Sequence, residues 1–556
     1  MQTSEHSPAG LDLETRQIIL SSVREFGRRE FPDETLQKFD ESSTFPQDLV
    51  RRLIGPDLGL HLLFIPEDQG GLGAGARDIC EVCETLASID LGIATSVLAT
   101  ALGTDPIRVG GTAEQKAHWL ERIAEEGLLV AYGVTEPGAG SNVASLKAKA
   151  ERVERNGVIE GYRITGTKRF ITNGGVADLY TILARTPNGP SFFVVEAGTE
   201  GLTPGREENK HGIRASNTAE VILEDLYVPA DHLLGLEEGQ GLLHASRVFG
   251  YTRLMVAAFG VGAGVDAMRR AVEYARERVQ FQTPLITKQG YTHKLIIPHI
   301  VALQAARAYI QQIAEQLDRD GSDHPVEASA AKLFAAENAA AADAAVQALG
   351  GYGYMKEYLV EKIRRDVKIT TIYEGTSEIQ REIVGRGRWK DLLAGKGKLY
   401  EDLSDEMLRL EQDHPGMGAK AVAQSAIAYL DLVRRCRKAR LGRRQHVIFE
   451  LGELAAWIET TAALVRKAAR VRQHNTSASF WPDAMAAMAR IQASRTAAKT
   501  ALTATDILQG TDTERLDKEG GFDAMGLLMV QTGTAQSLDL LADLVREEDL
   551  LADPVA

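Results

Sequence analysis

Cysteine is scarce in this chain, with three residues among 556, and no disulfide framework can be built from them. Such low usage is typical of a reducing compartment, so we expect a cytoplasmic protein. Cys80 and Cys83 form a Cys-x-x-Cys pair on an apolar helical stretch. No second pair accompanies it, so we expect neither a metal site nor a redox role there.

Long apolar runs are also lacking. No window reaches the roughly 18 apolar residues that a membrane span needs. The N-terminal residues, Met-Gln-Thr-Ser-Glu-His-Ser-Pro, contain neither a basic segment nor an apolar core, which argues against a signal peptide. We therefore expect a soluble protein, attached to a membrane at most peripherally.

Positive charge is in deficit, with 63 Lys and Arg against 77 Asp and Glu, a formal net charge of -14. A phosphate backbone would be repelled by such a protein, so nucleic acid is not expected as a partner. Residues 434–444 nevertheless concentrate basic side chains. They form either a solvated helix face paired with acids elsewhere or a contact with an acidic partner or with anionic lipid at the inner face of a membrane.

The chain is too long for one hydrophobic core, and its composition is that of a soluble globular enzyme. Apolar positions spaced three and four apart predict helices before residue 130, and runs of β-branched and aromatic residues then predict strands. We expect a fold that is mainly α with a small antiparallel middle β domain. The predicted parts are a helical N-terminal domain (1–130), the β domain (131–241), a helical bundle (242–394), a loop-like linker (395–418) and an extra helical C-terminal domain (419–556).

Local signals refine this division. Asn-Gly pairs at 156–157 and 188–189 predict hairpin turns between strands at 180–184, 192–196 and 219–223 and their neighbours. The alanine-rich stretch 328–348 predicts closely packed long helices.

The sequence Tyr-Glu-Gly-Thr at 373–376 is the most informative motif. It puts one carboxylate, Glu374, on a turn between two helical stretches, beside a glycine that admits a ligand to the backbone. A carboxylate shielded from water there is a candidate general base. The alternative for any single loop glutamate is a solvated surface charge.

Three further segments supply context. The glycine-rich segment 132–142 could turn backbone N–H groups toward a ring or a phosphate. In 168–175, Phe170 and Thr172 lie two residues apart on a predicted strand, so we expect both on one face, against a flat ring. The segment 347–354 ends a helix at consecutive glycines, Gly350 and Gly351.

Together, in this order and spacing across roughly residues 10–390, these motifs resemble the acyl-CoA dehydrogenase family of FAD flavoproteins. The resemblance implies a helical N-terminal domain, a β-barrel-like middle domain and a four-helix bundle, with FAD between the β domain and the bundle. It also implies at least a homodimer, in which one subunit completes its neighbour's cofactor site. Residues after about 400 resemble the extra helical domain of the very-long-chain acyl-CoA dehydrogenases, which pairs subunits and approaches membranes.

The resemblance assigns site residues by their positions in the motifs. Flavin contacts are implied for Tyr132, Val134, Thr135, Gly140 and Ser141, and for Phe170, Ile171 and Thr172. Pyrophosphate and adenosine contacts are implied for Arg278, Gln289, Gln347, Gly350, Gly351, Thr376 and Glu378. Substrate contacts are implied for Ser141, Tyr251, Thr252, Arg253, Tyr373 and Gly375.

The implied reaction removes two hydrogens from an acyl-CoA thioester to give trans-2-enoyl-CoA, as in fatty acid β-oxidation. Glu374 would abstract the α-proton while flavin N5 takes the β-hydride, and the thioester oxygen would accept hydrogen bonds from the Glu374 N–H and from FAD. Electrons would pass to an electron-transfer flavoprotein. Some relatives carry their base at the position of Thr252, which cannot serve as a carboxylate base.

The chain departs from the family pattern at Asn142, where Asp is usual, at Phe170, where many members have Trp, and across 280–290. In the family that the chain resembles, the helices around 98–103 largely set the depth of the acyl pocket. The resemblance therefore implies room for a long or bulky acyl chain, because the residues there are small: Ser96, Ala99, Thr100, Ala101 and Gly103. Alternatives on the same scaffold are an acyl-CoA oxidase and a decarboxylating or desulfinating dehydrogenase. A non-catalytic, dehydrogenase-like assembly protein is a further alternative.

Overall fold

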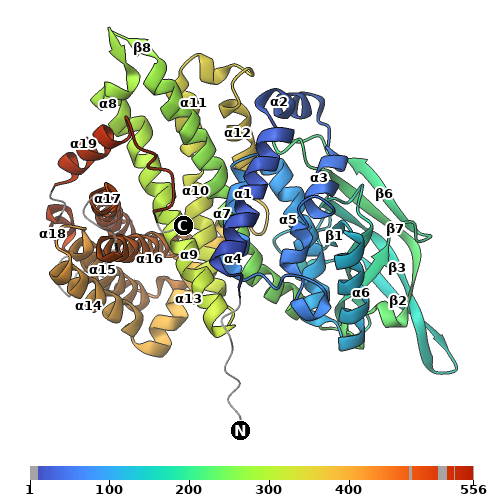
Figure 1. Ribbon diagram of the computed structural model, residues 1–556. Coiled ribbons are helices and arrows are strands. Elements are labelled where there is room, and N and C mark those ends of the chain that lie inside the picture. Colours follow the sequence, from blue (N-terminus) through green and yellow to red (C-terminus); the bar gives the residue numbers. More distant parts are fainter. Residues whose placement is uncertain (1–9, 475–478, 511–521, 531–532, 555–556) are drawn as a thin grey trace. The chain divides into compact units, whose positions relative to one another are not determined.

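Figure 1 shows the computed structural model of the chain, which describes residues 10–474, 479–510, 522–530 and 533–554. Its internal contacts define two compact units. Unit 1 comprises Met1–Gly262 and Ala314–Asp323, and unit 2 comprises Ala263–Ile313 and His324–Ala556.

Unit 1 begins with helices, as the sequence predicts. They are α1 (Leu13–Glu30), α2 (Asp33–Ser42), α3 (Gln47–Ile54), α4 (Ala76–Ala87), α5 (Leu91–Gly110) and α6 (Ala113–Glu126). Side-chain caps fix several starts: the Asp12 carboxylate accepts from the Thr15 N–H, and Asp90 accepts from the Ile93 N–H. At the start of α6, Thr112 and Gln115 form a reciprocal capping box.

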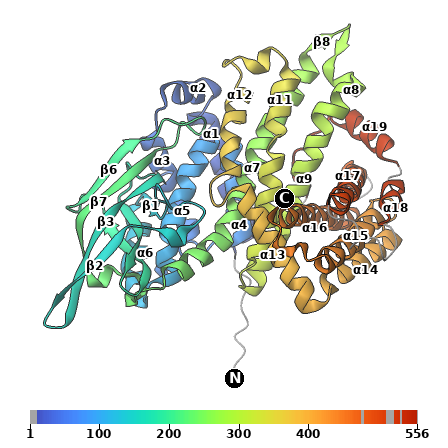
Figure 2. The same ribbon diagram turned by 180° about the vertical axis from the view of Figure 1, so that it is seen from behind.

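The β region follows α6 and forms one seven-stranded sheet in the order β1-β4-β2-β3-β7-β6, with β5 paired to β4. In Figure 2 β2, β3, β7 and β6 lie side by side. The strands are β1 (Val130–Gly133), β2 (Lys149–Arg155), β3 (Val158–Thr172), β4 (Leu179–Thr186), β5 (Gly189–Glu196), β6 (Leu202–Glu207) and β7 (Thr218–Pro229). Most neighbours are antiparallel, as expected, but β4 runs parallel to both β1 and β2, so the sheet is not purely antiparallel.

The two Asn-Gly pairs behave differently. Asn156 and Gly157 both have positive φ (53° and 77°) and form the two-residue turn between β2 and β3, as predicted. At the second hairpin Thr186 pairs with Gly189, so the turn residues are Pro187 and Asn188, one position earlier than the sequence suggested. Gly189 is already the first residue of β5.

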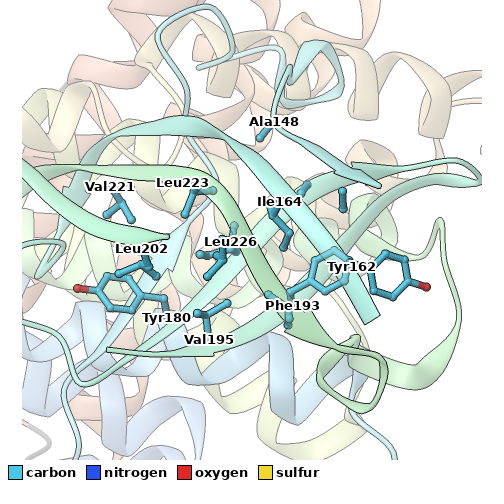
Figure 3. Close-up of a cluster of buried hydrophobic side chains, with 14 of the residues drawn as sticks. Ala148, Tyr162, Ile164, Tyr180, Phe193, Val195, Leu202, Val221, Leu223 and Leu226 are labelled. Carbon is cyan, nitrogen blue, oxygen red and sulfur yellow. The ribbon is translucent and has the colours of Figure 1, made fainter. Parts of the chain in front are cut away.

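One face of the sheet buries an apolar cluster, drawn in Figure 3, in which Tyr162 packs edge-on against Phe193 with ring centroids 5.0 Å apart. Ile164, Leu226 and Val195 fill the space around them and are almost fully buried. Alternation along the strands explains this core, because every second side chain points to the same face.

Unit 2 contains most of the bundle. Its helices are α7 (Gly241–Glu277), which begins in unit 1, α8 (Gln289–Tyr291), α9 (Ile297–Asp320), which ends in unit 1, α10 (Pro325–Asn338), α11 (Ala341–Leu349), α12 (Val360–Val367) and α13 (Ser377–Gly395). The hairpin β8 (Val279–Gln280) and β9 (Thr283–Pro284) follows α7. The alanine-rich stretch 328–348 forms two helices, α10 and α11, which are separated at Ala339 and Ala340, and its alanines are buried except for Ala340.

The prediction of a loop-like linker at 395–418 is wrong, because most of this segment forms the helix α14 (Lys398–Asp413). The glycines that suggested a loop, Gly397 and Gly418, have positive φ and lie just before α14 and just before α15 (Ala419–Lys438). Further helices follow: α16 (Gln445–His474), α17 (Trp481–Gln509), α18 (Ala524–Met529) and α19 (Thr534–Leu544). Figure 1 shows α14, α15, α16 and α17 stacked together.

A buried ion pair joins this C-terminal region to the bundle. Arg388 of α13 donates from Nε and Nη2 to the two carboxylate oxygens of Glu459 on α16, each at 2.8 Å, and from Nη2 to Glu327 of α10. The hydroxyls of Tyr309 and Tyr400 donate to the same Glu459 carboxylate at 2.8 and 2.9 Å. Burial alone would raise the pKa of Glu459, but the Arg388 guanidinium and the Tyr309 and Tyr400 hydroxyls together outweigh it and lower that pKa.

The last described residues are fixed on α9. The Gln304 amide donates to the carbonyl oxygens of Leu550 and Ala552, each at 2.8 Å, and the Arg307 guanidinium donates to Leu551 O at 2.9 Å. Buried Lys467 donates to the Asp553 carboxylate at 2.6 Å. The chain end is therefore an integral part of unit 2.

Helix α7 corrects one expectation from the sequence. Over the described residues it alone is long and apolar enough to pass a test for a membrane span, with a mean hydropathy of 1.4 in its most apolar window. Because 88% of that window is buried within the protein, core packing explains its apolar character.

Candidate active site

The Tyr-Glu-Gly-Thr motif forms a turn in unit 2, as predicted, between the 3-10 helix η9 (Lys368–Thr371) and α13. Glu374 has φ 53° and Gly375 has φ 93°, so two consecutive residues are left-handed. For a residue with a Cβ this conformation costs roughly 1–2 kcal/mol and persists only where its surroundings hold it. Glu374 is half-buried.

Two buried side chains hold this turn by its carbonyl oxygens. Lys332 of α10 donates from Nζ to Tyr373 O at 2.9 Å and also to Gly375 O. Gln380 of α13 donates from Nε2 to Glu374 O at 2.9 Å and to Gly375 O at 3.0 Å. Both side chains are 0% exposed.

The close approach of Gln380 also explains Gly375. A Cβ built at Gly375 would lie 2.6 Å from Gln380 Nε2, and the positive φ would strain any other residue. Sequence reasoning overlooked both Lys332 and Gln380. The signal for Lys332 was present, since it is the one charged residue in the apolar run 328–336.

A second feature of unit 2 is a cavity of about 470 Å³ beside the end of α7. Its walls include Arg278, Gly350 and Gly351 from the predicted cofactor set, together with Tyr274 and Tyr352. The Arg278 guanidinium lies 5.5 Å from the Tyr352 ring centroid. A Cβ at either glycine would meet no atom of the described residues within 4 Å, so the backbone faces open space. This arginine, open backbone and aromatic rings fit the anionic diphosphate and flat adenine of FAD.

Other predicted contacts of unit 2 lie outside that cavity wall. The Gln289 amide donates to Asp539 of α19 at 2.7 Å, and the Gln347 side chain is exposed. The Thr376 hydroxyl caps α13 by accepting from the Ile379 N–H. Glu378 is exposed, and backbone and Thr376 hydrogen bonds lower its pKa. The Tyr373 side chain is half-buried.

In unit 1 a buried ion pair shapes the glycine-rich segment that follows β1. Lys168 of β3 donates from Nζ to Glu136 at 2.7 Å and to Val134 O at 3.3 Å. Glu136 also accepts from the backbone N–H groups of Lys147 and Ala148. Burial opposes ionisation of Glu136, but these donors outweigh it and lower its pKa. The loop is thereby fixed to the sheet.

This fixed loop carries the first predicted flavin segment. Tyr132 and Val134 are buried, Thr135 O accepts the Arg169 N–H at 2.8 Å, and Gly140 and Ser141 are exposed. A Cβ at Gly140 would meet no atom of the described residues within 4 Å. The segment therefore offers accessible backbone on a rigid support, which fits a flat, polar-edged ring.

The second flavin segment departs from a regular strand. The register of β3 against β7 shifts between Lys168 and Ile171, and Phe170 has φ 59°. Strict alternation therefore does not apply here, so strand geometry does not support the prediction that Phe170 and Thr172 share a face. Phe170 is 58% exposed while Ile171 is buried, so the bulge turns an aromatic ring outward and leaves Ile171 in the core.

The structure describes the side chains of two of the three predicted substrate residues of α7, Thr252 and Arg253. Thr252 is fully buried and its hydroxyl donates to Val248 O at 3.2 Å, while the Arg253 guanidinium lies 6.0 Å from the Phe249 ring centroid. The Tyr251 side chain lies outside the described residues.

The small residues of α5 do not all leave open space. A Cβ at Gly103 would lie 2.7 Å from Val130 Cγ1 and 2.9 Å from the Val130 carbonyl carbon, so this glycine allows α5 to pack against β1. Its carbonyl oxygen accepts from the Thr181 hydroxyl at 2.9 Å. Gly103 is thus explained by the packing of α5 against β1. The prediction that this glycine leaves room for an acyl chain is corrected accordingly.

The thiols of Cys80 and Cys83 are buried in α4, and burial raises both pKa values. Such thiols are poor nucleophiles at neutral pH.

Comparison with known proteins agrees with this architecture. Residues 14–127, 131–226 and 239–388 match the N-terminal, middle and C-terminal domains of acyl-CoA dehydrogenase, respectively. An acyl-CoA dehydrogenase of Bacillus subtilis is 39% identical over 379 residues, covering 66% of this chain and 96% of that protein. Butyryl-CoA dehydrogenase of Megasphaera elsdenii is 35% identical in structure comparison, with a TM-score of 0.64, covering 68% of this chain and 98% of that one.

A third match extends over the C-terminal region. The structure of an acyl-CoA dehydrogenase from Bacillus anthracis complexed with FAD has a TM-score of 0.82 and covers 98% of this chain and 96% of that chain, at 23% identity. It shows that the fold as a whole, including the added helices, occurs elsewhere.

The chain belongs to the acyl-CoA dehydrogenase family. It is accordingly an oxidoreductase and a flavoprotein whose cofactor is FAD. The predicted fold is confirmed: helical terminal domains enclose a middle β domain in the sequence, and extra helices follow the bundle.

Proposed function

We propose that this protein oxidises an acyl-CoA thioester between its α and β carbons to give a trans-2-enoyl-CoA, with Glu374 as the base. The observation that carries the assignment is the left-handed turn at Glu374, held through three consecutive carbonyl oxygens by Lys332 and Gln380. Strain retained and supported in this way is typical of functional sites.

The chemistry requires more than a base. A proton α to a thioester carbonyl is too weakly acidic for a carboxylate in water, so the site must stabilise the enolate-like charge as it develops. The Glu374 side chain would accept the proton, and its own backbone N–H would donate to the thioester oxygen. When bound, FAD supplies the acceptor for the hydride that leaves the β carbon.

Residues of each unit support the cofactor assignment separately. In unit 1 the accessible loop at Gly140 and Ser141 and the outward Phe170 ring would contact the flavin ring. The family resemblance adds Thr135 and Thr172 at the polar edge of that ring. In unit 2 the cavity at Arg278, Gly350 and Gly351 would hold the diphosphate and adenosine.

The acyl group proposed is long or bulky. Ser96, Ala99, Thr100 and Ala101 on α5 still support this, whereas Gly103 no longer does. A panel of butyryl-, octanoyl-, palmitoyl- and cyclohexanecarbonyl-CoA, scored by anaerobic bleaching of the flavin absorbance, tests it. Faster reduction by butyryl-CoA than by every longer or cyclic thioester would contradict the proposal.

The electron acceptor proposed is an electron-transfer flavoprotein, and the reaction would serve fatty acid β-oxidation in the cytoplasm. Peroxide production in air that matches turnover with an artificial acceptor would instead identify an oxidase. Carbon dioxide or sulfite release from an acidic acyl chain would identify the decarboxylating or desulfinating alternative. No flavin bleaching with any thioester would favour an assembly protein.

We also propose a homodimer or a dimer of dimers. Its support is the apolar surface at the β8–β9 hairpin, where Phe281 is 91% exposed, and at Tyr354, which is 79% exposed. The segment 434–444 is partly a paired helix face, since Arg434 binds Glu401 and Arg435 binds Asp431. Arg437, Arg440, Arg443 and Arg444 are exposed, which supports peripheral contact with anionic lipid.

The deciding experiment replaces Glu374 by glutamine. Glu374→Gln should keep FAD bound but slow flavin reduction by at least about 10³-fold, because the proton acceptor is removed. Glu382→Gln, which removes a carboxylate from the same helix α13, is the matched control and should reduce at the wild-type rate. Flavin bleaching at the wild-type rate in Glu374→Gln would refute the role of Glu374 as the base.

A further inference from the structure

Lys332 is an unusual residue for its place in α10. Its side chain is 0% exposed on an alanine-rich helix, where burying a lysine carries a large cost of desolvation. Two of its hydrogen bonds go to carbonyl oxygens of the catalytic turn, those of Tyr373 and Gly375. A neutral donor would satisfy these oxygens with a smaller cost of desolvation.

The Tyr373 oxygen has a direct geometric link to the proposed chemistry. It belongs to the same peptide group as the Glu374 N–H, and in a planar trans peptide the C=O and N–H bonds point in opposite directions. A group that fixes the oxygen therefore fixes the direction of the N–H. A protonated amine at this position also draws electron density toward the oxygen and strengthens the N–H as a donor.

Gln380 completes the arrangement from the other side of the turn. Its amide holds the next two carbonyl oxygens, those of Glu374 and Gly375, so the peptide groups on both sides of Glu374 are fixed. The left-handed backbone at Glu374 and Gly375 is what turns these successive oxygens toward the two donors.

We propose that Lys332 is a positioning residue for the oxidation: through the Tyr373 carbonyl it orients and polarises the Glu374 N–H, the proposed donor to the thioester oxygen. This inference rests on the proposed function. Lys332 acts through the peptide group and is assigned no part in proton transfer. A purely structural lysine would alter stability when replaced but would leave the polarisation of the bound thioester unchanged.

The polarisation can be measured without turnover. In Glu374→Gln, octanoyl-CoA carrying an isotopic label at its thioester carbonyl should bind without being oxidised, and infrared difference spectra report its C=O stretch. Adding Lys332→Met should move that stretch toward the frequency of octanoyl-CoA free in water, because the donor is weakened. An unchanged stretch in the double variant would overturn the proposal.

Kinetics supply the second readout. With Glu374 intact, Lys332→Met should lower the rate of flavin reduction by about 10²-fold, comparable to the loss of one oxyanion donor, with little change in KM. Lys332→Gln keeps a donor but not the charge, so it should recover part of the rate and serves if the methionine variant does not fold.

The matched control is Lys467→Met, which removes another buried lysine of unit 2 that binds Asp553 away from the turn. It should lower stability while retaining the wild-type rate and carbonyl frequency. Equal kinetic losses in Lys467→Met and Lys332→Met would overturn the positioning role. Unimpaired reduction in Glu374→Gln would instead refute the proposed function itself, so the two failures are distinguishable.

Discussion

Replacing Arg388 by methionine would leave the Glu459 carboxylate buried without its cation. The side chains of Arg388 and Glu459 are 5% and 12% exposed, and their two hydrogen bonds of 2.8 Å form a bidentate pair. Tyr309 and Tyr400 would still donate to Glu459, but neither carries a charge.

Breaking a buried pair by removing one partner costs about 3–5 kcal/mol, because the remaining charge is desolvated and unpaired. Arg388→Met should therefore lower the free energy of unfolding by about that amount. The double variant Arg388→Met with Glu459→Gln should recover most of it, leaving a deficit of about 1–2 kcal/mol for imperfect hydrogen bonding.

Urea unfolding of the FAD-loaded protein at pH 7, followed by far-UV circular dichroism, measures both values. Arg434→Met is the matched control, since Arg434 and Glu401 form an exposed pair worth about 0–1 kcal/mol. A loss below about 1 kcal/mol in Arg388→Met, or no recovery in the double variant, would refute the reasoning.

Two further predictions concern stability. Burial opposes ionisation of Asp553, but Lys467 and Arg307 outweigh it and lower its pKa, so its stabilisation should be present above the unfolded pKa near 4 and be lost as pH falls. The difference in urea stability between wild type and Asp553→Asn should therefore shrink from pH 7 to pH 3, and a constant difference would contradict this. Gly103→Val should cost about 1–3 kcal/mol by thermal unfolding, because its Cβ meets Val130, and Gly138→Ala, with open space at its Cβ, should cost far less.

Turns and helix ends that depend on neighbouring residues could be predicted from the sequence. Asn156 and Gly157 tolerate positive φ better than other residues, so a two-residue turn could be placed between strands. The helix stop at Gly350 and the turn at Glu374 were predicted for similar reasons, since glycines marked both. These signals involve only neighbours in the chain.

Features that depend on contacts between residues far apart in the chain could not be predicted from the sequence. The helix α14 was taken for a loop because glycines lie at both of its ends, while Tyr400 and Met407 bury their side chains against partners the sequence does not identify. The bulge at Phe170 depends on the register of β3 with β7, more than 40 residues away. Lys332 was overlooked because its partners lie on another element.

The hydrogen bonds between α9 and residues 550–552 affect the order in which parts of unit 2 can fold. Gln304 is separated from Leu550 by 246 positions, so its amide cannot reach its final partner until that much more chain has been made. At about 5–20 residues per second, synthesis imposes a delay on the order of 10–50 s. The contact between Gln304 and Leu550 is therefore a late step in the folding of unit 2.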